Sequence, residues 1–396
     1  MIARIFLTSL ALLLFTSPAQ ASFVPDQTVE LHAHLFMKEG MSWMFHGDFF
    51  GPLQAHDYHD RFRSQANPET LEKSGLGIVV VSLYANPLLV MDLRDSIRRQ
   101  ITLAEKFVRE HPQWIIAKGA SEARAALNSG KRVLILELEG ASGILENEQD
   151  YREFIDQRGI RIVTVLHLTD DKFGGVAFLR GIRALSTPLA WLKSLVRGSV
   201  HDGVRENPNG LTEDGRKLAA ALIERGVWID LAHSSDASQH ELIPILEMAN
   251  QPILYTHTAL RRFHGAERGI TDWQLAEVKK TRGIIGLMPS EFMLEGTTPP
   301  RPGCPSGIAA LETQYILAVS AIGDPAAVML GSDYNGGIPH LAPGCNTGTK
   351  LDSEGLWNIS GVPEVWKALK KLGALTPDPL SGMEERFLES WRQVKP

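Results

Sequence analysis

The chain has 396 residues, of which 44% are hydrophobic and 22% are charged, and it contains only 2 cysteines. A chain of this length and composition can bury a large core without disulfides, which excludes disordered, collagen-like and small disulfide-stabilised proteins. Lys and Arg total 40 against 46 Asp and Glu, a net charge of −6, and there is no long basic run. Nucleic acid is therefore not an expected partner.

Residues 1–21 have the pattern of a signal peptide. A positive charge at Arg4 precedes an apolar run over residues 5–15, and the small residues Ala19 and Ala21 lie where a signal peptidase cleaves. The apolar run is short for a transmembrane helix, so an uncleaved anchor is the less favoured interpretation. We expect an exported protein, periplasmic or secreted, with no membrane insertion after cleavage.

The two cysteines, Cys304 and Cys345, both lie in loops rich in Pro and Gly. In an oxidising compartment such a pair is expected to form a disulfide, and two free thiols are the alternative. The chain-entropy model gives such a disulfide a stabilisation of about 4 kcal/mol.

Eight short apolar or β-branched runs predict eight strands. In chain order they cover residues 28–34, 77–84, 132–139, 161–167, 227–233, 252–257, 283–288 and 328–333. The intervals between them contain helical patterns over residues 88–110, 150–158, 213–225, 237–248, 272–281 and 307–321. Because several strands are apolar almost throughout, both of their faces should be covered by other structure. Eight βα repeats close most economically into a (β/α)8 TIM barrel, and an open doubly wound sheet is the main alternative.

We find no internal repeat or long linker, so residues 22–396 are expected to form a single barrel domain. Two connections are much longer than the others, residues 35–75 after the first strand and residues 168–210 after the fourth. Loops of this length often cover functional sites, and we expect these two to act as lids.

Polar side chains end most of the predicted strands. They are His32, His34, Glu139, His167, His233, His257 and Asp333. In a parallel barrel the carboxyl ends of all strands face one mouth, where barrel enzymes have their active sites. Imidazoles and carboxylates suit Zn²⁺, Mn²⁺ or Fe²⁺, and this set is large enough for two ions, which together can activate water and polarise a carbonyl. Any one of these residues alone is as often structural, but their convergence predicts metal-assisted hydrolysis.

Five short motifs occur in order across the chain after the signal peptide. They are Glu139-Gly140, Gly210-Leu211-Thr212-Glu213-Asp214-Gly215, Ile229-Asp230-Leu231-Ala232-His233-Ser234, Tyr255-Thr256-His257-Thr258 and Gly331-Ser332-Asp333-Tyr334. Together they resemble the membrane (renal) dipeptidase family of metallopeptidases. The resemblance implies a (β/α)8 barrel that holds two zinc ions.

The resemblance also implies a role for each candidate residue. His32 and His34 would bind the first metal, Glu139 would bridge both metals, and His233 with His257 would bind the second. Three further side chains would act on the substrate: Asp333 as the acid/base carboxylate, His167 as a donor to the oxyanion, and Arg268 as the partner of the substrate's free carboxylate.

His34 departs from the family pattern, in which the first motif usually reads His-x-Asp. A neutral ligand replaces an anionic one there, which makes the metal pair more electrophilic and can change metal preference. Other metal-dependent hydrolases carry His-x-His at this strand. In much of that wider group a modified Lys at the end of the fourth strand bridges the metals, whereas this chain has His167 at that place, which favours a bridge by Glu139.

These observations predict an exported binuclear metallo-dipeptidase that acts on small peptides. One alternative is another amidohydrolase on the same metal site, such as a deacetylase, a lactonase or a phosphotriesterase-like enzyme. A second is an exported binding protein that keeps the barrel without turnover. The sequence leaves the oligomeric state open, including a homodimer.

Overall fold

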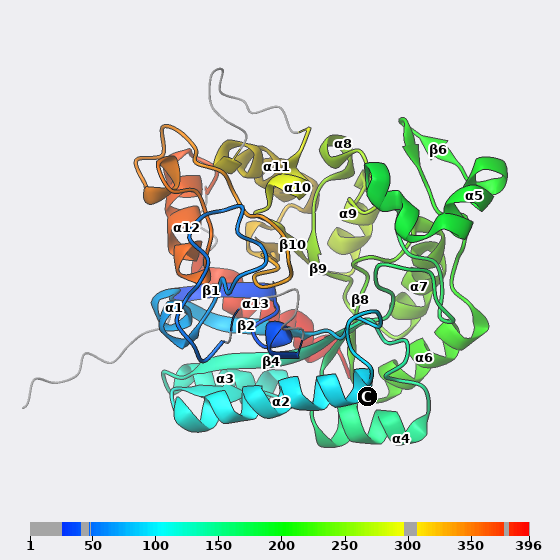
Figure 1. Ribbon diagram of the computed structural model, residues 1–396, viewed down its shortest axis with the longest axis horizontal. Helices are drawn as coiled ribbons and strands as arrows, with labels where there is room; N and C mark the ends of the chain where they lie inside the picture. The colour runs from blue at the N-terminus through cyan, green and yellow to red at the C-terminus, as the bar shows by residue number, and fades with distance from the viewer. Residues whose placement is uncertain (1–25, 41–46, 48, 297–306, 376–379, 396) are drawn as a thin grey trace, which may run out of the picture.

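The computed structural model describes residues 26–40, 47, 49–296, 307–375 and 380–395 (Figure 1). The predicted signal peptide lies outside these residues. So does Cys304, and its pairing with Cys345 therefore stays a prediction, although Cys345 itself is disulfide-bonded. Within the described part of the chain, no helix combines the length and the apolar character needed to cross a membrane.

Eight parallel strands close into a barrel, which confirms the predicted (β/α)8 fold. The strand order around the barrel follows the chain, β2 pairs directly with β4, and the last strand pairs with the first through Glu30 and Leu330. The barrel strands are β1 (Asp26–Ala33), β2 (Leu76–Leu83), β4 (Arg132–Glu139), β5 (Ile162–Thr164), β8 (Trp228–Asp230), β9 (Leu254–Thr258), β10 (Ile284–Leu287) and β11 (Val328–Leu330).

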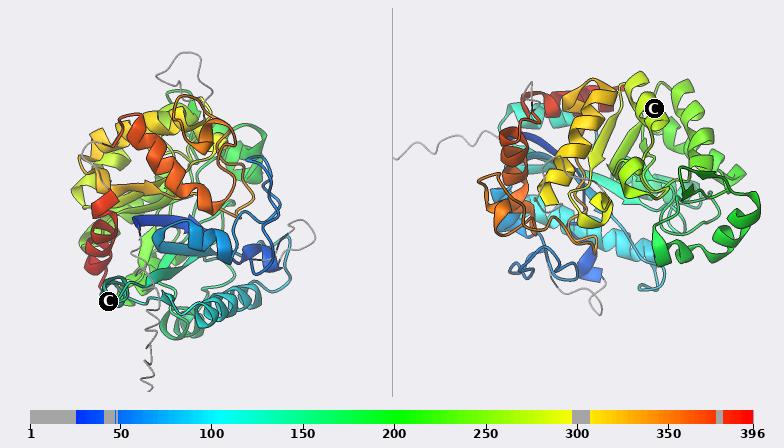
Figure 2. Two further views of the ribbon diagram at one scale, coloured as in Figure 1. Left: turned by 90° about the vertical axis from the view of Figure 1, so that its left-hand side faces the viewer. Right: turned by 90° about the horizontal axis from the view of Figure 1, so that it is seen from above.

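Helices surround the barrel, as the further views show (Figure 2). Five predicted helices are present as α2 (Leu93–Glu110), α6 (Glu213–Glu224), α7 (Asp236–Met248), α9 (Asp272–Lys280) and α11 (Gly307–Ile322). The predicted helix over residues 150–158 is a short α4 (Glu148–Asp150) that continues as a π-helix (Tyr151–Gln157).

Several elements were not predicted. They are α1 (Pro68–Lys73), β3 (Trp114–Ile116), α3 (Ala120–Asn128), α5 (Pro188–Arg197), the hairpin of β6 (Val200–His201) and β7 (Val204–Arg205), α8 (Arg261–His264), α10 (Glu291–Leu294), α12 (Val362–Lys371) and α13 (Leu380–Gln393). Of these, β3 adds a ninth strand that pairs with β4 outside the barrel ring, and α13 packs against β1 and α3.

The two long connections contain short elements rather than open loops. The first holds a 3-10 turn (Met37–Gly40) and α1, and the second holds a 3-10 helix (Gly181–Ser186), α5 and the β6–β7 hairpin.

Towards its carboxyl end the barrel interior is polar. The hydroxyl oxygen of Thr164 lies 3.0 Å from a carboxylate oxygen of Glu137 and 2.6 Å from one of Asp230, and it donates to the closer one. The hydroxyl of Thr256 also donates to Asp230, at 2.7 Å, and a carboxylate oxygen of Glu30 accepts from the backbone of Ser332 at 2.6 Å. Buried carboxylates are costly unless they are hydrogen-bonded; here Thr164 connects Glu137 with Asp230, and Glu30 is bonded separately to the backbone.

Candidate metal centre and active site

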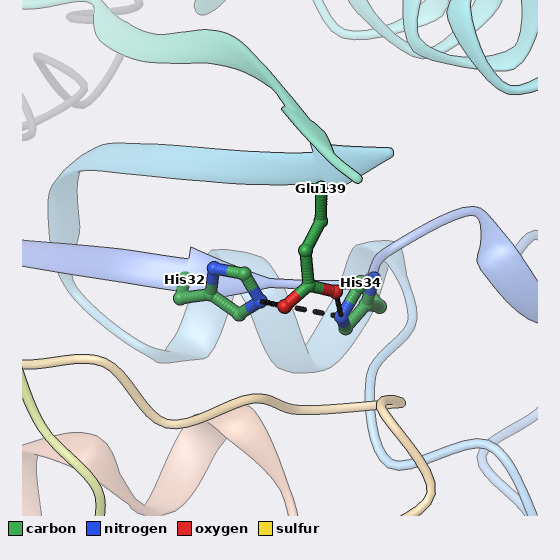
Figure 3. Close-up of side chains that lie close together, drawn as sticks. All are labelled: His32, His34 and Glu139. Atoms are coloured by element: carbon green, nitrogen blue, oxygen red, sulfur yellow. Dashed lines mark hydrogen bonds and ion pairs between the residues drawn. The ribbon is translucent and has the colours of Figure 1, made fainter. Parts of the chain in front are cut away.

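Two groups of potential metal ligands meet at one carboxylate, that of Glu139. His32 and His34 form the first group with it, and His233 and His257 form the second; within each group the donor atoms lie within 4.8 Å of one another. Figure 3 shows Glu139 extending from the end of β4 between the two imidazoles of the first group. The side chains that the sequence predicted as ligands are therefore all brought together.

The distances to Glu139 are similar for all four imidazoles. Nε2 of His32 and Nε2 of His34 lie 3.6 and 3.3 Å from its two oxygens. Nε2 of His233 and Nε2 of His257 lie 3.2 and 3.4 Å from Oε1. One carboxylate thus faces both groups, as a bridging ligand would.

Strand geometry explains how these side chains converge. His32 and His34 are two residues apart along β1 and its end, so they share one face. Glu139 is the last residue of β4, and His257 lies within β9. His233 follows β8 with a φ of 66°, a left-handed conformation that costs a non-glycine residue about 1 kcal/mol or more. Such strain occurs most often at functional sites.

The imidazoles are oriented by groups behind them. Nδ1 of His32 lies 2.9 Å from a carboxylate oxygen of Glu137. Nδ1 of His257 lies 3.0 Å from the hydroxyl of Thr256, which itself donates to Asp230. When Nδ1 carries the proton in this way, Nε2 presents its lone pair to the site, as metal-binding histidines do.

The donor set fits divalent ions. Two pairs of imidazole nitrogens face each other closely: Nε2 of His32 and His34 lie 3.2 Å apart, and Nε2 of His233 and His257 lie 2.9 Å apart. Burial acts to raise the pKa of Glu139, but the surrounding imidazoles hold it well below its usual range, so the carboxylate is ionised. Four nitrogens and one ionised carboxylate match the ligand preferences of zinc, and all of these side chains except the partly exposed His233 are buried.

Asp333 and His167 lie beside the two groups. Oδ1 of Asp333 is 3.2 Å from Nε2 of His34, and Nε2 of His167 is 3.5 Å from Oε1 of Glu139. Burial lowers the pKa of His167 to about 4, so its ring is neutral at pH 7 and able to donate one N–H. The ring of Tyr84 packs edge-on against it with centroids 4.5 Å apart.

Arg268 is buried, with 5% of its surface exposed, and it faces the same cavity. Its Nη2 donates to the carbonyl of His257 at 2.9 Å, and it forms no ion pair with a carboxylate in the described residues. Asp272, an acidic residue four positions further along the chain, pairs with Arg262 instead. Burial lowers the pKa of Arg268 to about 10, despite the attraction of the carboxylates of Asp230, Glu139 and Asp333, and an anionic ligand in direct contact would stabilise the charged guanidinium.

Except for His32, the proposed ligands open into one cavity of about 420 Å³, together with His167, Arg268 and Asp333. Both long connections contribute to its wall, through Arg61 and Phe62 from the first and Leu179 and Arg183 from the second. Apolar side chains form another part of the lining; they are Met37, Met288, Phe292, Met293 and Ile338. A cavity of this size and character accommodates a small molecule rather than a protein chain.

Sequence reasoning missed Glu137 and Gly336 as parts of this site. Glu137 stands inside a strand that is otherwise apolar from Val133 to Leu138, and a lone charge in such a run was a usable signal. A Cβ atom on Gly336 would lie 1.7 Å from Oδ1 of Asp333. Only glycine therefore leaves room for this placement of Asp333, which itself has a φ of 58°.

Comparison with known proteins identifies the family. The model of the membrane dipeptidase family, peptidase family M19, matches residues 24–371. This chain is a member of the membrane dipeptidase family. The match covers every strand of the barrel and every candidate site residue.

Relatives in the family are distant in sequence. Dipeptidase ataJ of Aspergillus terreus is 24% identical over 196 residues, which are 49% of this chain and 45% of that protein. Dipeptidase 3 of Rattus norvegicus is 23% identical over 354 residues, 88% of this chain and 62% of that protein. The chain thus spans about half to three fifths of the length of these curated relatives.

Solved structures of two metallopeptidases share the fold. A dipeptidase of family M19 called AC superimposes with a TM-score of 0.68 at 18% identity, covering 94% of this chain and 99% of that one. A metallopeptidase from Rhodobacter sphaeroides, solved with a phosphinate mimic of the dipeptide L-Ala-D-Ala, gives a TM-score of 0.67 at 17% identity, covering 93% and 99%.

Proposed function

We propose that this protein is an exported binuclear metallo-dipeptidase. One observation carries the substrate assignment: the buried guanidinium of Arg268, which lacks a carboxylate partner in the described residues, faces the same cavity as both groups of metal ligands. A guanidinium in this position suits the free carboxylate of a short peptide, because the two groups pair through parallel hydrogen bonds. Membership of the dipeptidase family supports the same assignment.

Two divalent ions, for which Zn²⁺ fits the donor set, would be held by His32, His34, Glu139, His233 and His257. When bound, such a pair lowers the pKa of water towards neutrality and polarises the scissile carbonyl. His34 contributes no charge, so Glu139 is the single anion among these ligands.

The remaining side chains handle the substrate and the proton. Asp333 takes the proton released as water attacks the amide carbonyl carbon and delivers it to the leaving amine nitrogen as the C–N bond breaks. Neutral His167 donates its N–H to the oxygen on which negative charge develops. Arg268 binds the terminal carboxylate, which fixes the peptide bond over the centre.

If the site served one of the alternative activities, Arg268 would not bind a terminal carboxylate of the substrate. A deacetylase, lactonase or phosphotriesterase-like enzyme has no terminal carboxylate for Arg268 to bind. An exported binding protein would hold metal and ligand without turnover. Export itself rests on the signal-peptide pattern of residues 1–21, and cleavage after Ala21 is checked by mass spectrometry of protein recovered outside the cytoplasm.

The first experiment measures metal content by elemental analysis and, on the same sample, hydrolysis of L,L and L,D dipeptides. We expect near two metals per chain and dipeptide cleavage that a chelator abolishes. The matched substrate is the same dipeptide as its C-terminal amide, which we expect to be a poor substrate because it lacks the anion for Arg268. Ester or lactone hydrolysis without dipeptide cleavage would support the amidohydrolase alternative, and two metals without any turnover would support the binding protein.

A further inference from the structure

Large apolar side chains are exposed in one continuous stretch of the second long connection. Among the described residues, twelve large hydrophobic side chains are exposed, and seven of them lie between residues 182 and 200. We call these seven the α5 face; they are Ile182, Leu185, Leu189, Leu192, Leu195, Val196 and Val200. Scattered exposed hydrophobic residues are ordinary, but their concentration in one short segment of the chain points to an interaction surface.

The helix α5 buries small side chains and exposes large apolar ones, which is the reverse of an ordinary surface helix. It buries the small side chains of Ala190 and Ser194 and exposes the large ones of Leu189 and Val196, by 81% and 86%. Leu189, Leu192 and Val196 follow one another at spacings of three and four residues, so they form one stripe along the helix. In Figure 1, α5 and β6 project at one edge of the molecule. The stripe therefore faces away from the barrel.

The charge of this region is opposite to that of the whole chain. Residues 180–201 contain Arg180, Arg183, Lys193 and Arg197 and no Asp or Glu, whereas the full chain has a net charge of −6. Of these cations, Arg180 approaches Glu295 at 3.7 Å, and the other three form no ion pair with a carboxylate in the described residues. An apolar stripe flanked by basic side chains is the pattern of helices that lie in the surface of an anionic bilayer.

We propose that the α5 face docks on an anionic lipid surface. The apolar stripe of α5 would enter the boundary between head groups and acyl chains, and Lys193 and Arg197 would contact the lipid phosphates. A second copy of this chain fits less well, because a two-fold interface on this face would place its like charges opposite each other. The same segment reaches the active-site cavity, since Arg183 lines that cavity and lies over the ring of Phe292. The docked protein would thus hold its cavity close to the bilayer.

Vesicle co-sedimentation tests the proposal with the full chain after signal cleavage. Phosphatidylcholine vesicles are compared with vesicles in which part of this lipid is replaced by phosphatidylglycerol. We expect binding to the anionic vesicles only, weakening as salt is raised. The double variant Leu189→Ser/Val196→Ser should abolish binding, and each of Lys193→Gln and Arg197→Gln should weaken it about fivefold.

The matched control is Leu88→Ser/Met248→Ser, which removes two equally exposed hydrophobic side chains elsewhere on the surface and should leave vesicle binding intact. All variants should keep the dipeptidase activity of the parent in solution, which also shows that they fold. Absence of binding to anionic vesicles, or binding that the α5 variants do not change, would overturn the proposal. So would a dimer in sedimentation velocity that Leu189→Ser/Val196→Ser converts to monomer, because the α5 face would then be a subunit interface.

Discussion

At the scale of single residues, Arg268 decides between the candidate activities. Replacement of Arg268 by Met should raise KM for free dipeptides roughly 10- to 100-fold, because a charge-assisted pair with the substrate carboxylate is lost. Turnover of the corresponding dipeptide amides should change little. Steady-state kinetics on both substrates measure the difference, and Arg262→Met, at a surface arginine paired with Asp272, is the control. An equal loss on both substrates would show that Arg268 supports the fold rather than the substrate.

Glu137 offers a second residue-scale test, because it contacts Nδ1 of the proposed ligand His32 and lies beneath the site. Glu137→Gln keeps the shape of the side chain but removes its carboxylate. That carboxylate orients the imidazole of His32 and makes it a more basic ligand. Metal affinity should fall about 10- to 100-fold, as it does when such outer partners are changed in metal sites. Competition with a chromophoric chelator measures the affinity directly, and Glu354→Gln at an exposed position is the control. Unchanged affinity would mean that Glu137 serves only the barrel interior.

The ligands could be predicted from the sequence because each belongs to a strand or closely follows one, and strands are recognisable. Arg268 was assigned only through the family resemblance, since nothing local distinguishes it from a surface arginine. The sequence could not show that Glu267, the neighbour of Arg268, does not pair with it. The carboxylate of Glu267 instead accepts backbone N–H groups from Phe178, Asn207 and Asp236. That depends on contacts between segments far apart in the chain.

At the scale of elements, the loop after β11 positions Asp333, and His340 anchors that loop. Nε2 of His340 donates to the carbonyl of Ser332 at 3.0 Å, while Nδ1 faces the amide nitrogen of Gln65 at 3.3 Å. These two bonds suit a neutral ring, and burial lowers the pKa of His340 to about 4. If the ring were protonated, Nδ1 would carry a hydrogen and would no longer accept the N–H of Gln65.

The stability of this loop should therefore depend on pH in a defined direction. In the unfolded chain His340 has a pKa near 6.5, so below that pH the unfolded state binds a proton that the folded state does not. The stabilisation is fully present above about pH 6.5 and is lost as the pH falls towards 4, by up to about 3 kcal/mol. His340→Gln should lose less stability over this window than the parent, as measured by urea unfolding at pH 7 and at lower pH. Parallel losses in both proteins would contradict the assignment.

The barrel strands were predictable because a strand covered on both faces is apolar along its whole length. The elements that were missed are short or lie outside the βα repeat. The helix α5 is an example, because it exposes its leucines and buries Ala190 and Ser194, the reverse of the pattern by which amphipathic helices are recognised. The edge strand β3 pairs only with β4, outside the barrel ring, so it does not belong to the repeating βα pattern by which the barrel strands were recognised.

At the scale of the whole molecule, the proposed metal centre joins distant parts of the barrel. Its ligands come from β1 and the residue that follows it, from β4 and β9, and from the residue that follows β8 by three positions. The donor atoms of these ligands meet only when the barrel is folded. The folded state should therefore bind metal and the unfolded state should not, so that metal and stability are linked.

Chelation should accordingly lower the melting temperature, and returning Zn²⁺ should restore it in a concentration-dependent way. A free metal concentration one hundred times Kd adds about 2.7 kcal/mol to the free energy of unfolding, which corresponds to about 3 °C for a chain of this length. Differential scanning calorimetry across a zinc titration measures the effect. Glu139→Gln, which removes the shared ligand, is the matched control and should show little response to zinc. A melting temperature that is the same with chelator and with zinc would mean that the strand-end cluster does not hold metal in the folded protein.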